Sequence, residues 1–196
     1  MVNSTSISAT LGARNDALHE RVEDDYYASN PKAAEYLLSV ESFSNIWECA
    51  VGGGHLAEIF KSKGSLSRCS DIIDRGYPNT EIIDFLQFNE KWRGDIITNP
   101  PFQFAINFMK KGLEVIEEGN KLALFLPVRY LTGKARGKVF VEHPPKSVHV
   151  SSCTVSLKCA RNGDFGLKTT SGASEYMWVV WQKGFTGNTS LNWFNG

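Results

Sequence analysis

The sequence predicts an α/β fold, in which helices flank a mostly parallel β-sheet. Apolar segments of strand length alternate with segments of helical spacing along the chain. A glycine-rich turn, residues 52–54, follows the first expected strand, and the strand at residues 95–98 runs into two prolines. Alternating strands and helices need crossover connections, which make successive strands parallel. Ligands of such sheets bind beyond the carboxyl ends of the strands, so we expect a site at those turns.

The first half of the chain contains the expected turns. Pro31 favours a helix start, Gly64 favours a helix end, and Asn99-Pro100 stops the strand before it. The elements expected here are helices at 33–40 and 55–63 and strands at 45–50, 66–71, 81–85 and 95–98.

The second half continues the alternation. Pro127 ends a buried-type strand, and Pro144-Pro145 follow a helical segment. The polar, glycine-containing segment at 153–174 is expected to be a long loop. The elements expected here are helices at 104–118 and 132–141 and strands at 121–126, 147–151 and 175–182.

Composition indicates an ordinary globular protein. With 196 residues, 42% hydrophobic and 21% charged, we expect one domain at residues 13–196 after a flexible N-terminus at 1–12. That N-terminus lacks the pattern of a secretory signal, and no apolar run reaches the length of a membrane span. The four cysteines form no CxxC pair, which predicts a cytoplasmic protein with reduced thiols and no metal site.

Charge is divided unevenly along a chain whose net charge is zero. Residues 1–98 carry 9 Lys and Arg against 15 Asp and Glu, and residues 99–196 carry 12 against 6. No acid interrupts the basic residues of the segment 121–138, which are Lys121, Arg129, Lys134, Arg136 and Lys138. Such a strip can follow the phosphates of a nucleic acid, or it can be a solvated helix face.

The turn at residues 48–54, Glu-Cys-Ala-Val-Gly-Gly-Gly, has the features of a ligand-binding loop. Glycines let the backbone approach a ligand closely, and the following helix offers free N–H groups. The same glycines with Ala57 also satisfy a loose dinucleotide pattern. Asp71 ends the next strand, where a carboxylate can accept hydrogen bonds from ribose hydroxyls, although Asp74 is close enough to be the residue concerned.

The tetrapeptide Asn99-Pro100-Pro101-Phe102 is the more specific motif. Two prolines fix the backbone and remove two N–H donors, and Asn99 adds a side-chain carbonyl oxygen. Two fixed acceptors beside an aromatic ring suit an exocyclic amine on a flat base, because they stabilise the positive charge that grows on its nitrogen. Phe102 can stack on such a base.

With these motifs the chain resembles class I S-adenosylmethionine-dependent methyltransferases. It is most similar to small adenine-N6 DNA methyltransferases of phages and prophages, whose pattern is (Asn/Asp)-Pro-Pro-(Tyr/Phe). The resemblance covers roughly residues 24–194 and implies a Rossmann-like, seven-stranded, mostly parallel sheet. It also implies that residues 175–182 and 190–194 form an antiparallel C-terminal hairpin, and that there is no separate target-recognition domain.

The resemblance implies roles for individual residues. The catalytic residues that it implies are Asn99, Pro100, Pro101 and Phe102. Tyr27 belongs to a segment similar to the family's Tyr-x-Thr-Pro-Pro. The cofactor-binding residues that the resemblance implies are Tyr27, Glu48, Ala50, Gly52, Gly54, Asp71, Asp84 and Phe85. Its expected substrate-binding set is Phe102, Arg129, Lys134 and Arg136, with the loops 129–138 and 153–174 contributing to recognition. A target base inside a duplex would have to be flipped out.

The predicted function is therefore methylation of adenine N6 in DNA with S-adenosylmethionine, in a bacterial or phage-infected cell. RNA methylation and protein glutamine methylation use the same tetrapeptide and stay open. A nicotinamide-dependent oxidoreductase would use the glycine-rich loop but would leave Asn99 to Phe102 unexplained. A non-catalytic relative that only binds nucleic acid is the remaining alternative.

Overall fold

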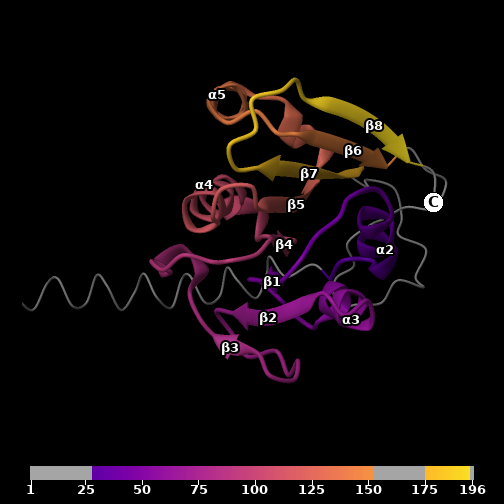
Figure 1. Cartoon of the computed structure of the whole chain (residues 1–196), viewed down its shortest axis with the longest axis vertical. Helices are drawn as coiled ribbons and strands as arrows, with labels where there is room; N and C mark the ends of the chain where they lie inside the picture. Colours follow the sequence, from indigo (N-terminus) through magenta and orange to yellow (C-terminus); the bar gives the residue numbers. More distant parts are fainter. Residues whose placement is uncertain (1–27, 152–174, 195–196) are drawn as a thin grey trace, which may run out of the picture.

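The computed structural model describes residues 28–151 and 175–194, and these residues build one central sheet with helices on both faces (Figure 1). The strands are β1 (Ile46–Glu48), β2 (Leu66–Asp71), β3 (Glu81–Ile82), β4 (Ile96–Thr98), β5 (Lys121–Pro127), β6 (Ser147–Ser151), β7 (Tyr176–Gln182) and β8 (Ser190–Phe194). The helices are α2 (Pro31–Val40), α3 (His55–Ser62), α4 (Ala105–Val115) and α5 (Lys134–Glu142), with 3₁₀ turns η1 (Phe85–Gln87), η2 (Phe102–Phe104) and η3 (Val128–Leu131).

The eight strands lie in the order β3-β2-β1-β4-β5-β7-β6-β8. The strands from β3 to β5 are parallel, β7 is antiparallel to both of its neighbours, and β8 is parallel to β6. The predicted α/β class with a mostly parallel sheet is therefore confirmed. The four turns that follow β1, β2, β3 and β4 lie at one edge, as parallel strands require.

Two expectations for the sheet are wrong. The sheet has eight strands instead of seven, and β7 and β8 do not form a hairpin, because β6 lies between them. Burial explains the difference. Residues 177–181 of β7 are buried, so this strand belongs inside the sheet, whereas residues 190–193 of β8 are exposed, as at an edge. β6 pairs with β7 on one side and with β8 on the other.

Several element boundaries also differ from those expected. The third strand is only two residues long, because Asp84 caps the turn η1. The helix expected at 104–118 ends at Val115. The N-terminus at 1–12 and the loop at 153–174 lie outside the described residues. Within the described residues, no helix has the length and apolar character needed to cross a membrane.

Two apolar layers cover the sheet. On one face α2 and α3 bury residues such as Leu37 and Phe60 against Ile97, Phe125 and Trp178. On the other face α4 and α5 pack through Met109 and Val139 against the sheet. Trp92 packs against Trp47 in this second layer. The two layers hold the strand ends, and thus the turns beyond them, in fixed positions.

The amino edge of the sheet is held by an ion cluster around Glu41, at the end of α2. Its carboxylate accepts hydrogen bonds from Lys121 Nζ at 2.6 Å and from Ser147 Oγ at 2.7 Å. Lys121 was expected to belong to the basic strip, and this is wrong. It begins β5, whereas Arg129 follows the other end of that strand. Lys121 therefore ties α2 to the sheet and lies away from the turns that form the site.

Candidate functional site

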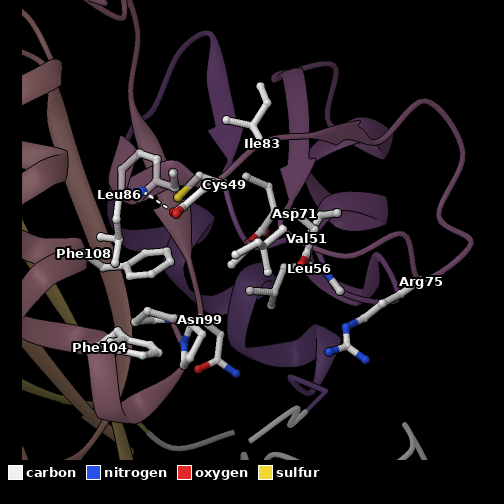
Figure 2. A pocket seen from close by; sticks show the side chains of 18 of the residues that line it. Cys49, Val51, Leu56, Asp71, Arg75, Ile83, Leu86, Asn99, Phe104 and Phe108 are labelled. Atoms are coloured by element: carbon white, nitrogen blue, oxygen red, sulfur yellow. Dashed lines mark hydrogen bonds between the residues drawn. The ribbon is translucent and has the colours of Figure 1, made fainter. Parts of the chain in front are cut away.

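A cavity of about 300 Å³ lies at the carboxyl ends of β1, β2 and β4 (Figure 2). Its volume is within the range of small-molecule sites. Figure 2 shows Asp71 and Asn99, which come from different turns, in the same cavity, with Arg75 to one side. The predicted site residues of the described chain that line it are Glu48, Ala50, Gly52, Asp71, Asp84, Phe85, Asn99, Pro100, Pro101 and Phe102. The glycine-rich turn and the tetrapeptide thus face one cavity.

The glycine-rich turn needs glycine for two different reasons. Gly52 and Gly54 both have positive φ, at 54° and 82°, a conformation that other L-residues rarely adopt. A Cβ atom on Gly54 would also come within 2.0 Å of the ring of Tyr77. Tyr77 donates a hydrogen bond of 2.8 Å from its hydroxyl to Glu58 Oε1 of α3. Gly54 does not itself line the cavity, and its place is behind the turn, against Tyr77.

Asp71 connects the turns after β1 and β2. Its Oδ2 accepts a hydrogen bond of 2.8 Å from the backbone N–H of Gly52, and its Oδ1 accepts one of 3.2 Å from Ile73. Asp71 is buried and lines the cavity. Asp74 is exposed, accepts a hydrogen bond from Gly76 N and does not line the cavity. Of the two carboxylates that the sequence left open, only Asp71 is placed to reach a ligand there.

Glu48 ends β1 beneath the turn with only 1% of its surface exposed. Burial holds the pKa of Glu48 well above its usual value, and the nearby charge of Asp71 raises it further. The Thr98 hydroxyl lies near enough to oppose this rise. Among the described residues, neither Glu48 Oε2 nor Thr98 Oγ1 makes a well-formed hydrogen bond. The protonated form is therefore favoured until a donor or a cation reaches this carboxyl group.

Asp84 and Phe85 form another wall of the cavity. Asp84 Oδ1 accepts a hydrogen bond of 2.9 Å from Leu86 N, which starts the turn η1. Phe85 is buried and packs against Trp47 and Phe108. The two residues therefore offer a carboxylate beside a flat apolar surface, as a heterocycle with an amino group would require.

The tetrapeptide leaves β4 at the cavity and enters η2 directly. The Phe102 ring lies near two tyrosine rings, with its centroid 6.5 Å from that of Tyr130 and 5.9 Å from that of Tyr176. The Tyr130 hydroxyl donates a hydrogen bond to the Phe102 carbonyl. Asn99 and Phe102 therefore line the same cavity on a backbone that two prolines and a tyrosine constrain.

The predicted basic residues lie outside the cavity. Arg129, Lys134 and Lys138 are exposed, in η3 and α5. Arg136 donates from Nε to the Thr132 carbonyl at 2.7 Å, and its guanidinium lies 4.7 Å from the centroid of the Tyr130 ring. The strip therefore follows the carboxyl end of β5, and Arg136 contacts Tyr130, the residue that donates to the Phe102 carbonyl.

Sequence reasoning missed several residues of the site. Tyr27 lies outside the described residues, but its neighbours Ala28 and Ser29 line the cavity, and Ser29 is buried. His55, assigned only to the helix start, and Arg75, in the turn after β2, also line it. Their only signal was their place in turns at the carboxyl edge. The further apolar lining residues are Val51, Leu56, Ile72, Ile83, Leu86, Phe104 and Phe108.

No protein-family model matches this sequence, and no curated protein matches it significantly. Solved structures do resemble the fold. A modification subunit of a putative type I restriction enzyme from Vibrio vulnificus YJ016 aligns over 100% of this chain and 53% of its own, with 12% identity and a TM-score of 0.54. A putative hemolysin from Lactococcus lactis aligns over 85% and 94%, with 10% identity and a TM-score of 0.55.

A third structure is the N-methyltransferase NodS from Bradyrhizobium japonicum WM9 in complex with S-adenosyl-L-homocysteine. It aligns over 80% of this chain and 89% of its own, with 12% identity and a TM-score of 0.50. At these identities the likeness concerns the fold alone, which this chain shares with a restriction-enzyme modification subunit and an N-methyltransferase. This chain spans only about half of the Vibrio subunit.

Proposed function

We propose that this chain binds S-adenosylmethionine in the cavity and transfers its methyl group to an exocyclic amine. The observation that carries the proposal is that the glycine-rich turn and Asn99 to Phe102 face the same cavity. A methyl transfer needs a donor site and an acceptor site in contact, and these two motifs supply one each. The N-methyltransferase with the same fold was solved with S-adenosyl-L-homocysteine, the product that such a donor leaves.

The cofactor half of the site is assigned to the first three turns. Gly52 brings backbone close to the ligand, and Asp71 accepts hydrogen bonds from the ribose hydroxyls with the lone pairs that its backbone donors leave free. Asp84 and Phe85 hold the adenine. Glu48 lies under the glycine-rich turn, where the positive charge of the cofactor favours its ionised form. The bound cofactor supplies an activated methyl group on a sulfonium ion.

The acceptor half is assigned to the tetrapeptide. Asn99 Oδ1 and the Pro100 carbonyl accept hydrogen bonds from the two N–H groups of the target amine. These bonds favour a pyramidal nitrogen, and they stabilise the positive charge that develops as it attacks the methyl carbon. Phe102 stacks on the base and holds it in line. As the nitrogen–carbon bond forms, the methyl–sulfur bond would break to leave the neutral thioether, and the positively charged methylated amine would lose its proton to water.

Adenine N6 in DNA is the proposed target. The flat surface of Phe102 suits a purine, and the exposed cations of η3 and α5 lie beyond the same edge of the sheet. A restriction-enzyme modification subunit shares the fold, which supports DNA as the acceptor. Phe102, Arg129, Lys134 and Arg136 are the proposed contacts to the polynucleotide.

The experiment that tests this function offers labelled S-adenosylmethionine with DNA, RNA and a glutamine-containing protein extract in parallel. Nucleoside analysis of the products is expected to give labelled N6-methyl-2′-deoxyadenosine, from DNA only. Label in RNA or in glutamine would keep the amine chemistry and change the acceptor. Binding of a nicotinamide cofactor in preference to S-adenosylmethionine, measured by calorimetry, would overturn the proposal.

A further inference from the structure

Tyr130, in η3, connects the tetrapeptide to the basic strip. Its hydroxyl donates a hydrogen bond to the carbonyl of Phe102, and its ring lies beside the Phe102 ring. The Arg136 guanidinium lies over the Tyr130 ring, 4.7 Å from its centroid. Three residues from η2, η3 and α5 therefore contact one another in series, and only the first of them lines the cavity.

We propose that Tyr130 is a positioning residue that fixes Phe102 in the orientation needed to stack on the target base. The proposal rests on the proposed function, because it assumes that Phe102 receives a base. Tyr130 does not line the cavity, so it acts through Phe102 and not on the reacting atoms.

The backbone of the tetrapeptide explains why such a residue is needed. Pro100 and Pro101 have no N–H groups, so these two residues donate no backbone hydrogen bonds. Backbone hydrogen bonds run from Phe104 N to Pro101 O and from Ala105 N to Phe102 O. The Tyr130 hydroxyl adds an attachment from the neighbouring strand end to the carbonyl of the residue that bears the stacking ring. This attachment limits rotation of η2 relative to β5.

The aromatic surroundings of Phe102 support the same role. The Tyr176 ring also lies near the Phe102 ring, with centroids 5.9 Å apart, and it is itself stacked on Phe125 with centroids 5.2 Å apart. Phe125 is fully buried in the sheet. Phe102 thus contacts both a ring fixed by the core and a ring held by a hydrogen bond. Arg136, which also donates to the Thr132 carbonyl, covers the Tyr130 ring from α5.

The decisive variant is Tyr130→Phe, because it removes the hydroxyl and keeps the ring on which Arg136 lies. We expect single-turnover methyl transfer to fall about five- to ten-fold, which is the loss typical of one neutral hydrogen bond. The affinity for S-adenosyl-L-homocysteine is expected to stay unchanged, because Tyr130 is outside the cavity. The matched control is Tyr36→Phe, which removes a hydroxyl that contacts His149 Nδ1 at 3.4 Å, away from the cavity. Its transfer rate is expected to equal that of the parent.

A second readout does not depend on activity. Protein labelled with 4-fluorophenylalanine gives a ¹⁹F resonance for Phe102, which Phe102→Leu identifies by its absence. Tyr130→Phe adds one new resonance, that of the introduced phenylalanine. The Phe102 resonance itself is expected to shift or broaden in this variant. In Tyr36→Phe, the Phe102 resonance is expected to keep its position.

The two readouts separate the positioning role from the proposed function. If the parent methylates nothing, the proposed function fails, and the ¹⁹F spectra alone decide whether Tyr130 holds Phe102. If the parent is active but Tyr130→Phe transfers methyl at the parental rate with an unchanged Phe102 resonance, the positioning role is overturned. A loss of cofactor affinity as large as the loss of turnover would also overturn it, because that result indicates only general damage to the fold.

Discussion

The backbone N–H of Gly52 donates a hydrogen bond of 2.8 Å to Asp71 Oδ2, so the turn after β1 is held by the last residue of β2. One carboxylate therefore both shapes the glycine-rich turn and lines the cavity. Asp71→Ala is expected to weaken binding of S-adenosylmethionine and of its demethylated product. The loss of a charged hydrogen bond costs about 1.5–3 kcal/mol, and calorimetric titration measures it.

Asp74→Ala is the matched control for this substitution. Asp74 is exposed and holds only Gly76 in its own turn, so its loss is expected to leave both affinities unchanged. An Asp71→Ala protein that binds the cofactor like the parent would remove Asp71 from the site. Damage from Asp74→Ala alone would transfer the role to Asp74.

Gly54 faces the ring of Tyr77, and this contact predicts a strong effect of Gly54→Ala. For a residue with a Cβ atom, the left-handed conformation costs about 1–2 kcal/mol. The Cβ would also meet Tyr77 at 2.0 Å, and such overpacking costs about 1–3 kcal/mol more. Thermal unfolding is expected to show both costs, together with weaker cofactor binding because the turn moves.

Gly64→Ala separates these two costs. Gly64 also has a positive φ, of 70°, but nothing lies within 4 Å of the place where its Cβ would be. Only the conformational cost is then expected, with no change in cofactor affinity. Equal losses of stability for the two alanine variants would mean that the Tyr77 ring moves away freely.

The sequence predicted those parts of the site that depend on short local patterns. The turn of residues 52–54 and the tetrapeptide were found because glycine and proline restrict the backbone wherever they occur. Parallel topology then brought the two motifs to one edge. Arg75 was missed, because a single Arg in a turn has no distinguishing pattern.

The errors concern long-range contacts. Lys121 looked like part of a basic strip, but its partner Glu41 is 80 residues away in sequence. The resemblance implied that β7 and β8 form a hairpin, yet β6 pairs with both. Neither contact can be predicted from the spacing of nearby residues, because each joins segments that meet only in the folded chain.

Glu48 predicts a pH dependence of stability whose sign can be tested. Its raised pKa means that the folded chain keeps a proton which the unfolded chain releases as the pH rises through the usual glutamate range. The unfolded state then binds fewer protons, so this group lowers stability with rising pH. Glu48→Gln lacks the effect, and it is expected to gain stability relative to the parent from pH 4 to pH 7 in urea unfolding.

Glu81 is the control of opposite sign. Arg68 binds its carboxylate in a bidentate pair, and this pair lowers the pKa of Glu81. A lowered pKa stabilises the folded chain above the usual glutamate range, so Glu81→Gln is expected to lose stability relative to the parent as the pH rises. The change is expected to be small, because half of the Glu81 side chain, 51%, is exposed to solvent. Parallel stability curves for Glu48→Gln and the parent would contradict the protonated state of Glu48.

The basic strip predicts a salt-dependent affinity for the polynucleotide. Lys134 and Lys138 are exposed on α5, so replacing both by Ala is expected to weaken binding uniformly across sequences. The slope of log affinity against log salt is expected to fall by about one unit for each phosphate that the variant no longer neutralises. Lys63→Ala, an exposed cation at the end of α3, is the control. An unchanged slope in the double variant would make the strip an ordinary solvated face.

Asn99→Ala is expected to abolish methyl transfer while it leaves the fold and cofactor affinity intact. Asn99 follows the last residue of β4 and lines the cavity, outside both apolar layers. Its proposed hydrogen bond strengthens as the target nitrogen becomes positive, so its loss falls on turnover more than on substrate affinity. Loss of a comparable preorganised group lowers rates on the order of 10²–10³-fold.

Asn99→Asp makes this test sharper. It keeps an acceptor at the same place, and the pattern that the tetrapeptide resembles accepts Asp there, so partial activity is expected where Ala has none. Phe102→Tyr is expected to be tolerated for the same reason, whereas Phe102→Ala loses about 1–3 kcal/mol of base stacking. The measurement is single-turnover incorporation of labelled methyl into DNA, with cofactor affinity titrated in parallel. If Asn99→Ala transfers methyl at the parental rate, the tetrapeptide is only a turn. The proposal that this chain methylates an amine would then be overturned.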